Sequence, residues 1–364
     1  MGEPRQSRVR IRTFIELIRR ERVFVIVLAL GFLAAGLSYP YAQVAMWVGF
    51  AFAGYSAVAN DSIQTLGTFI ASNRERAWWQ LWLFIGGIFL VTVAWSWANY
   101  GGDVSYGRLA SKGFDKAPEN FAFLQIAAPL FLMILTRMRM PVSTTFLLLT
   151  SFATSGSSIQ KVVMKSLSGY VIAFVIAIAV WGLAGPWMKR KFVGKAHPAW
   201  RVGQWLSTGF LWSVWLQQDA ANIAVFLPRS LSVVQFLAFA GAIFIGLGVL
   251  FRMGGERIQE VVDEKSDVVD VRMATIIDFV YALILLYFKM HSKIPMSTTW
   301  VFVGLLGGRE LALAVRQANS DGRGVKAAAL LMGRDLLFVT IGFVVALLLA
   351  SGINPVVRAG FFGF

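Results

Sequence analysis

Long apolar blocks alternate with short polar or basic segments along most of the chain. Clear examples of these blocks are residues 23–37, 78–98, 171–187 and 327–350. A helix of about 20 apolar residues crosses the ~30 Å hydrocarbon core of a bilayer. Outer-membrane barrels instead show short segments of alternating polarity. The pattern therefore predicts an all-α polytopic membrane protein.

The order of the blocks recurs once along the chain. After a first helix at about 23–38, a five-element unit occupies residues 43–72, 77–98, 119–136, 141–155 and 162–187. A second unit occupies residues 202–227, 232–251, 274–288, 295–313 and 326–350. The predicted organisation is a basic tail with the first helix, a first repeat, a basic linker, a second repeat and a short tail, at residues 1–42, 43–188, 189–201, 202–350 and 351–364.

The basic residues indicate an orientation. With every block crossing and a cytoplasmic N terminus, 24 of the 34 Lys and Arg lie inside and nine outside, with Arg334 within a span. This is the bias of the positive-inside rule. We therefore expect about 11 transmembrane segments, an odd number per unit and thus two inverted repeats. The expected location is a plasma membrane, as in a bacterial inner membrane.

Composition changes this picture little. Of the 364 residues 57% are hydrophobic and 15% charged, and the net charge is +15. Retention of basic residues in cytoplasmic loops accounts for that charge, so no nucleic-acid partner is expected. The chain has no cysteine, which excludes disulfides and thiolate metal sites. The block at residues 141–155 is short for a span, and a paired half-helix would explain its length.

Each repeat contains a polar interruption around one acidic residue. The segment "ANDSIQTLG" contains Asn60, Asp61 and Gln64, and the segment "QQDAANIAV" contains Gln218, Asp219 and Asn222. A carboxylate inside a bilayer costs several kcal/mol unless it faces a partner or an aqueous cavity. Both aspartates are therefore functional candidates. The alternative is an aspartate that caps a broken helix or pairs with an arginine.

Each repeat also contains a Pro-x-Ser-Thr-Thr segment before an apolar run. These segments carry Ser143, Thr144, Thr145, Ser297, Thr298 and Thr299. Ser and Thr are good N-caps and Pro suits a helix start, so both segments predict helix N termini. Ordinary capping is one interpretation. The other is an anion site, because free N–H groups and the positive end of the helix dipole attract anions.

The four interruptions together predict transport chemistry. Two hydroxyl-rich helix ends offer hydrogen-bond donors to an oxyanion, while carboxylate and amide oxygens suit a hard cation or a proton. An inside-negative potential opposes anion entry by about 2.3 kcal/mol per charge per 100 mV, and a co-transported cation offsets this cost. The pattern is typical of a cation-coupled anion transporter.

The same motifs resemble those of the inorganic phosphate transporter (PiT) family, which includes sulfate permeases. That family is built from inverted repeats, each with an Asn-Asp-x-x-Asn type motif and a Pro-x-Ser-Thr-Thr-His type motif. The resemblance implies phosphate binding by Ser143, Thr144, Ser297 and Thr298. It implies a substrate or cation role, including Na⁺ binding at the aspartates, for Asp61, Gln64, Asp219 and Asn222. Homodimerisation is implied by resemblance alone.

This chain departs from the family pattern at four positions. Gln64 and Gln218 each stand where the family usually has Asn. Phe146 and Trp300 replace the histidine that usually follows Ser-Thr-Thr. These changes remove two donors from the neighbourhood of the anion, so they bear on the substrate and the coupling ion more than on the architecture.

The leading hypothesis is a secondary transporter that imports phosphate with Na⁺ or H⁺ by alternating access, without a cofactor. Phosphate keeps one or two protons at neutral pH, so Asp61 or Asp219 can accept a hydrogen bond that sulfate cannot give. A sulfate or other oxyanion permease is the alternative within this architecture. Other classes are a membrane enzyme acting on lipid phosphates, for which no catalytic signature is found, and a passive channel or sensor.

Two further acidic residues fall within apolar blocks. Asp278 and Asp335, the latter next to Arg334, are predicted to be buried. They could pair with each other or with a residue of the substrate path. A structural ion pair is the favoured interpretation, because neither has a counterpart in the first repeat.

Overall fold

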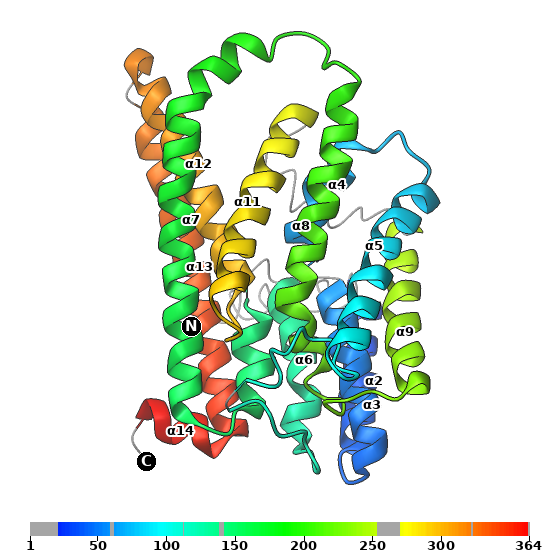
Figure 1. Ribbon diagram of the computed structural model, residues 1–364. Coiled ribbons are helices and arrows are strands. Elements are labelled where there is room, and N and C mark those ends of the chain that lie inside the picture. Colours follow the sequence, from blue (N-terminus) through cyan, green and yellow to red (C-terminus); the bar gives the residue numbers. More distant parts are fainter. Residues whose placement is uncertain are drawn as a thin grey trace, which may run out of the picture.

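The computed structural model describes residues 21–58, 62–111, 113–137, 142–252, 270–321 and 323–362. Within these ranges the secondary structure is helical and contains no strand. The helices pack side by side along one direction, as an α-helical membrane protein requires (Figure 1). The predicted all-α polytopic class is confirmed.

The helices follow the predicted blocks closely. The first part of the chain contains α2 (Arg22–Ser38), α3 (Ala42–Ser56), α4 (Ser62–Ser72), α5 (Trp78–Asn99), α6 (Phe123–Arg137), the π-helical turn η2 (Thr145–Leu149), the 3-10 turn η3 (Thr150–Phe152) and α7 (Gly156–Lys191). The second part contains α8 (Ala199–Ala224), α9 (Val233–Arg252), α11 (Val271–His291), α12 (Thr298–Asp321), α13 (Arg323–Ile353) and α14 (Pro355–Phe362).

Six of the described helices are long and apolar enough to cross a membrane: α5, α7, α9, α11, α12 and α13. Helices α2 and α6 are apolar but shorter. The outer surface of the bundle carries large apolar side chains, including Leu183, which is 81% exposed, and Val234, which is 76% exposed. Exposed aliphatic side chains of this kind are suited to contact with lipid tails.

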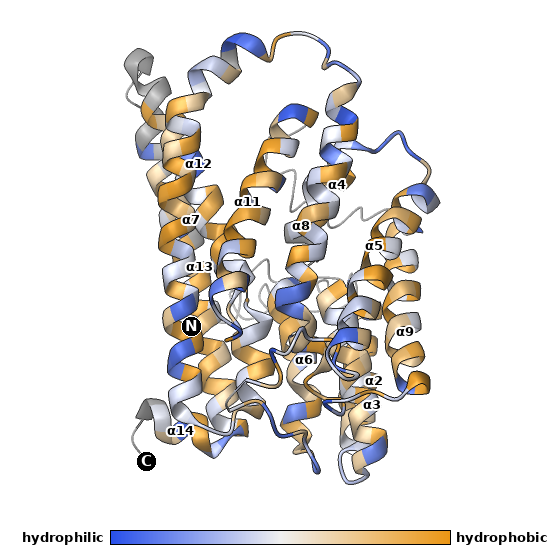
Figure 2. Ribbon diagram, in the orientation of Figure 1, coloured by the Kyte–Doolittle hydropathy of each residue, from blue (hydrophilic) through white to orange (hydrophobic). Residues whose placement is uncertain are grey.

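The polar connections lie at the two ends of the bundle. Helix α7 runs from the bottom of Figure 1 to the top, and α8 returns downward. Hydrophilic residues mark the α7–α8 connection and the α4–α5 connection, both at the top (Figure 2). The α5–α6 and α8–α9 connections lie at the other end. This places two segments predicted to be cytoplasmic on one face, while the inverted repeat itself stays a prediction.

The first Pro-x-Ser-Thr-Thr segment does not form a full-length span. Its helical part covers Thr145–Phe152, in a π turn followed by a 3-10 turn. Eight residues cannot cross a ~30 Å core at about 1.5 Å each. The second segment instead begins the 24-residue helix α12. The predicted 11 segments are therefore a mixture of full spans and short helices.

The two polar interruptions also differ. In the first half, α3 ends at Ser56 and is followed by π-helical residues 57–58, and α4 begins at Ser62. The corresponding block of the second half is the unbroken helix α8, although its sequence predicts an interruption as well. Ala220, Ala221 and Ala224 favour continuation of the helix in the second segment.

Helices α7 and α12 approach each other at glycines. A Cβ atom on Gly304 would lie 2.4 Å from the backbone oxygen of Tyr170, and one on Gly308 would lie 2.3 Å from that of Phe174. The two glycines are four residues apart, which is the small-residue spacing that lets membrane helices pack closely. This contact fixes α12, whose first turn belongs to the second Ser-Thr-Thr motif, against α7.

Replacement of Gly304 by alanine is expected to destabilise the protein by about 1–3 kcal/mol, because backbone atoms must move to make room. Gly185→Ala on α7 is the matched control, since a Cβ there meets nothing within 4 Å. The midpoint of thermal unfolding in detergent, followed by tryptophan fluorescence, measures the difference. Equal midpoints for the two variants would contradict the close contact.

Candidate functional site

The C-terminal end of α8 carries an acidic and an amide side chain one turn apart. Asp219 and Asn222 are each 2% exposed. Asn222 Nδ2 donates to Asp219 Oδ1 at 2.6 Å. This bond fixes the amide so that its nitrogen faces the carboxylate and its oxygen faces away from it.

The first Ser-Thr-Thr motif contacts the same amide. Asn222 Nδ2 lies 3.2 Å from both Thr144 Oγ1 and Thr145 Oγ1. The Thr145 hydroxyl in turn donates to the backbone oxygen of Met296 at 3.2 Å. Since Met296 directly precedes Ser297, the two Ser-Thr-Thr motifs are in direct contact.

The second motif approaches α8 from the opposite direction. The Thr298 side chain lies beside the Asp219 carboxylate. Trp215 Nε1 of α8 donates to Thr298 Oγ1 at 3.3 Å, and the Tyr281 hydroxyl donates to the Thr298 backbone oxygen at 3.0 Å. Helix α12 therefore begins with its first threonine beside the acid of α8.

The two serines of these motifs act as helix caps. Ser143 Oγ accepts a hydrogen bond from Phe146 N, and Ser297 Oγ accepts one from Trp300 N, each at 3.3 Å. The backbone N–H of Ser297 donates to Ser166 Oγ of α7 at 2.8 Å. Capping thus occupies the serines, which leaves the threonines to face Asp219 and Asn222.

The structure brings together Thr144, Thr145, Thr298, Asp219 and Asn222. Thr299 is buried in the first turn of α12. Gln218 faces α11, where its Nε2 donates to the backbone oxygen of Leu285 at 3.0 Å.

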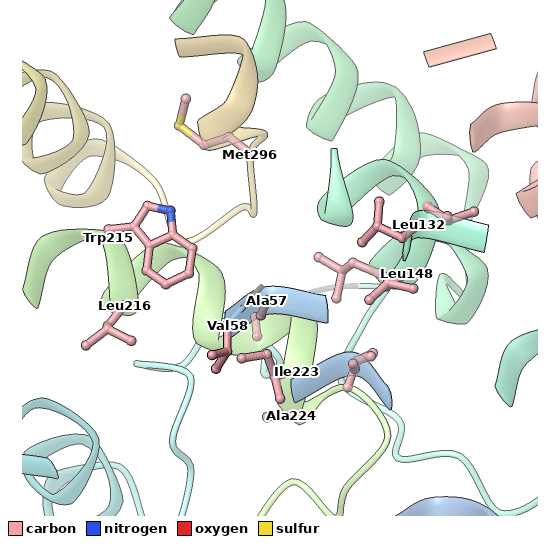
Figure 3. Packing of buried hydrophobic residues seen from close by; sticks show 14 of the residues in the cluster. Ala57, Val58, Leu132, Leu148, Trp215, Leu216, Ile223, Ala224 and Met296 are labelled. Carbon is pink, nitrogen blue, oxygen red and sulfur yellow. The ribbon is translucent and has the colours of Figure 1, made fainter. Parts of the chain in front are cut away.

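The interruption of the first half is described only in part. Asn60 and Asp61 lie outside the described residues, as does the side chain of Gln64. Figure 3 shows Ala57 and Val58, at the end of α3, beside Ile223 and Ala224 of α8. The chain therefore enters the first interruption next to the Asp219–Asn222 turn.

Several oxygens at this site are buried without a hydrogen bond from the described residues. They are Asp219 Oδ2, Asn222 Oδ1 and Gln218 Oε1. Buried polar atoms are nearly always paired in native proteins, so such atoms call for a ligand, an ion or water. Carboxylate and amide oxygens of this kind are suited to a hard cation or a proton.

A buried arginine near Asp219 is the main feature that the sequence did not reveal. Arg108 comes from the α5–α6 connection and is 2% exposed. Its Nε donates to the backbone oxygen of Gln217 at 2.6 Å, and its Nη1 lies 3.2 Å from those of Lys293 and Ile294. Arg108 therefore joins α8 to the segment that leads into the second motif.

The α5–α6 connection is folded so that Arg108 can point inward. Asp103 accepts hydrogen bonds from the backbone N–H groups of Ser105 and Gly107 at 2.8 and 2.6 Å. Gly102 has φ +90°, and its backbone oxygen accepts from Leu231 N at 2.9 Å. The only sequence signal for this fold was the concentration of Gly around Arg108, which does not indicate where the arginine points.

A lysine of α7 supports the same segment. Lys165 Nζ donates to the backbone oxygen of Ser292 at 3.1 Å and also to that of Ile294. No described carboxylate lies within ion-pair distance of Arg108 or Lys165, although Asp219 acts on Arg108 from further away. Burial lowers the pKa of Arg108 to about 10, so the guanidinium stays charged at neutral pH. The region beside Asp219 therefore carries excess positive charge.

This charge borders an open pocket between α7 and α11. The pocket has a volume of about 360 Å³ and is lined in part by Lys161, Lys165 and His291. Basic side chains around a concave surface attract anions. The pocket ends at Ser292 and Ile294, the segment that Arg108 and Lys165 hold.

The two aromatic residues that depart from the family pattern touch each other. The rings of Phe146 and Trp300 lie 5.4 Å apart, edge to face, and Phe343 of α13 contacts both. Each of the two follows a Ser-Thr-Thr motif, one in each half. The replaced histidine positions thus form an apolar contact between the motifs.

Comparisons with known proteins identify the fold. No protein-family model and no curated protein matches the sequence. A solved structure described as "The sodium-dependent phosphate transporter" is similar with a TM-score of 0.57 at 18% sequence identity, covering 87% of this chain and 98% of that one. The chain therefore has the fold of that transporter over nearly the whole length of both proteins.

Proposed function

We propose that the protein is a secondary transporter that imports inorganic phosphate together with Na⁺ or H⁺ by alternating access. The observation that carries the proposal is the meeting of both Ser-Thr-Thr motifs at Asp219 and Asn222. Buried Arg108 and half-buried Lys165 lie beside this site, and neither bonds a described carboxylate. The likeness to the fold of a sodium-dependent phosphate transporter supports it.

The threonines and the cations supply what an oxyanion needs. Thr144, Thr145 and Thr298 have hydroxyl groups that can donate once a ligand displaces their present partners. The N-terminal turn of α12 adds the positive end of a 24-residue helix. The guanidinium of Arg108 adds a full charge and Lys165 adds a further donor, and both favour a desolvated phosphate.

Asp219 favours phosphate over sulfate in this arrangement. Phosphate keeps at least one proton at neutral pH and can donate it to a carboxylate, whereas sulfate has none to give. A sulfate ion beside Asp219 would bring two unshielded negative charges together. A site built to accept a hydrogen bond discriminates strongly against a ligand that lacks the donor.

The unpaired oxygens of Asp219, Asn222 and Gln218 provide ligands for the coupling ion. Asp61, with Asn60 and Gln64, is proposed to supply the equivalent groups from the first half. The position of the α4–α5 and α7–α8 connections on one face supports a cytoplasmic N terminus under the positive-inside rule. Insertion as an inverted repeat in a bacterial inner membrane completes the proposal.

Uptake into proteoliposomes tests this function. Labelled phosphate is expected to accumulate in the proteoliposomes under an inward Na⁺ or H⁺ gradient. The lipid and detergent controls are expected to show no such accumulation. Asn222→Ala is expected to lower the initial rate at least 10-fold, about 1.4 kcal/mol, because Asn222 contacts Asp219 and both threonines of the first motif. Asn99→Ala, which changes an exposed amide of α5, is the control.

Two outcomes would contradict the proposal. Equal transport of sulfate and phosphate would mean that the protein is a broader oxyanion permease. Uptake that is independent of both the Na⁺ and the H⁺ gradient would mean that the protein is a passive channel and not a symporter.

A further inference from the structure

Asp278 is a second buried acid, away from the motif site. It lies in α11 and is 2% exposed. Its carboxylate contacts two other helices: Thr68 Oγ1 of α4 donates to Oδ1 at 2.8 Å, and Thr208 Oγ1 of α8 donates to Oδ2. Three helices thus meet at one carboxyl group.

Three described arginines on the surrounding helices pair with other acids. On α11, Arg272 pairs with Asp270, and on α12, Arg309 pairs with Glu310. At the start of α8, Arg201 lies 3.9 Å from Glu75.

Among the described side chains, no cation of α4 or α7 bonds the Asp278 carboxylate. The sequence of α4 contains no charged residue. On α7, Lys165 bonds backbone oxygens, and Arg190 donates to the backbone oxygen of Pro186. The ion pair expected from the sequence is therefore not what holds Asp278, whose bonded partners are two hydroxyls.

A carboxyl group in this setting is more stable with a proton than without one. An ionised carboxylate with no cation in a low-dielectric interior is strongly unfavourable, whereas the neutral acid is not. A threonine hydroxyl can donate to a carboxylate or accept from a carboxylic acid. Thr68 and Thr208 can therefore satisfy both forms without a rearrangement of the helices.

A row of polar groups leads from this acid to the end of α4. Ser72 Oγ donates to the backbone oxygen of Thr68 at 2.7 Å, and Gln204 Nε2 bonds Ser72 Oγ. Asn73 Nδ2 donates to Gln204 Oε1 at 2.9 Å. Asn73 is followed closely by Glu75, whose side chain is 90% exposed. The row thus leads from Asp278 toward the polar α4–α5 connection at the top of Figure 1.

The acid is separate from the motif site but shares a helix with it. Thr208 and Asp219 are 11 residues apart on unbroken α8, which is about 16 Å at 1.5 Å per residue. Between them α8 presents Leu211, Trp212 and Trp215, which are buried. Direct hydrogen bonding between the two acids is excluded by this distance.

We propose that Asp278, with Thr68 and Thr208, is a proton-binding site that exchanges its proton with water at the face where α4 ends. On loading, water at that face gives up a proton and an O–H bond forms on Asp278; on release, the proton returns to water and the carboxylate accepts from both threonines. The proton drives phosphate uptake, and this last step alone rests on the proposed function.

Infrared spectroscopy of the purified protein tests the site without any transport. Difference spectra between two pH values are expected to contain the carbonyl stretch of a protonated carboxylic acid, and Asp278→Asn is expected to remove it. Asparagine can still bond both threonines, so this variant is expected to fold. Asp219→Asn is the control: the carbonyl band assigned to Asp278 is expected to remain in this variant. A spectrum unchanged by Asp278→Asn would overturn the proton site.

Transport tests the coupling step. Asp278→Asn is expected to flatten the pH dependence of net phosphate uptake, while exchange of phosphate across the membrane stays within about threefold of the wild type. Asp278→Glu is expected to restore part of the pH dependence. An unchanged pH profile in Asp278→Asn would overturn the coupling role. A wild type that carries no phosphate would refute the proposed function instead, and the infrared result would still decide the site.

Discussion

Asp219→Asn is expected to lower phosphate uptake at least 100-fold. Asp219 Oδ1 accepts from Asn222 Nδ2 at 2.6 Å, and Oδ2 is the buried oxygen available to a ligand. The asparagine amide that replaces the Asp219 carboxylate has two orientations. In one its NH₂ faces the NH₂ of Asn222, and in the other its NH₂ faces the ligand. It also removes the negative charge that acts on Arg108. A 100-fold loss corresponds to about 2.7 kcal/mol, within the range for a charged hydrogen bond.

Initial rates of labelled phosphate uptake measure this effect, with thermal unfolding in detergent as the check on folding. Glu119→Gln, which neutralises an exposed acid at the end of the α5–α6 connection, is the matched control. The two variants change the net charge equally, so a general electrostatic effect would lower both rates. A rate for Asp219→Asn within threefold of the wild type would remove Asp219 from the transport site.

Arg108→Gln is expected to raise the KM for phosphate at least 10-fold. The substitution removes the charge of the guanidinium and its bonds to Gln217, Lys293 and Ile294. A buried guanidinium without a bonded acid is unfavourable unless an anion compensates it, so the charge contributes most when phosphate is bound. Arg108→Lys keeps the charge but not the fork geometry, and we expect an intermediate KM.

Arg229→Gln is the control that distinguishes two roles of Arg108, its charge and its anchoring of the α5–α6 connection. Arg229 holds the same α5–α6 connection through the backbone oxygens of Phe114 and Lys116, at 3.0 and 2.7 Å. Its loss is expected to loosen the connection, lowering the unfolding midpoint, while the KM changes less than threefold. Equal increases in KM for Arg108→Gln and Arg229→Gln would mean that Arg108 acts only as an anchor.

Hydropathy and motif order were enough to predict most of the architecture. The apolar blocks became helices because nothing else satisfies backbone hydrogen bonds in a bilayer. Ser143 and Ser297 follow local capping rules, so their positions at helix starts could be predicted from a few neighbouring residues. The meeting of Thr144 with Asn222 instead depended on recognising that the four interruptions belong to one site.

Other features depend on contacts between distant segments. The sequence of α11 predicts a buried Asp278 but not that Thr68 and Thr208 reach it. Arg108 lies in a polar, glycine-rich connection, where arginine is normally solvated, and only the fold of that connection buries it. The continuity of α8 likewise reflects packing and three alanines, which outweigh the helix-interrupting tendency of the neighbouring polar residues.

Unbroken α8 rigidly connects the motif site at Asp219 with the contact between Thr208 and Asp278. Because an α-helix is stiff along its axis, any tilt that displaces Asp219 must also displace Thr208, and with it the contact to Asp278. Helix α3 ends at Ser56 and α4 begins at Ser62, so the described helices of the first half are separate elements. Motion at the motif end of α8 is thus transmitted along the helix to the carboxyl group of Asp278.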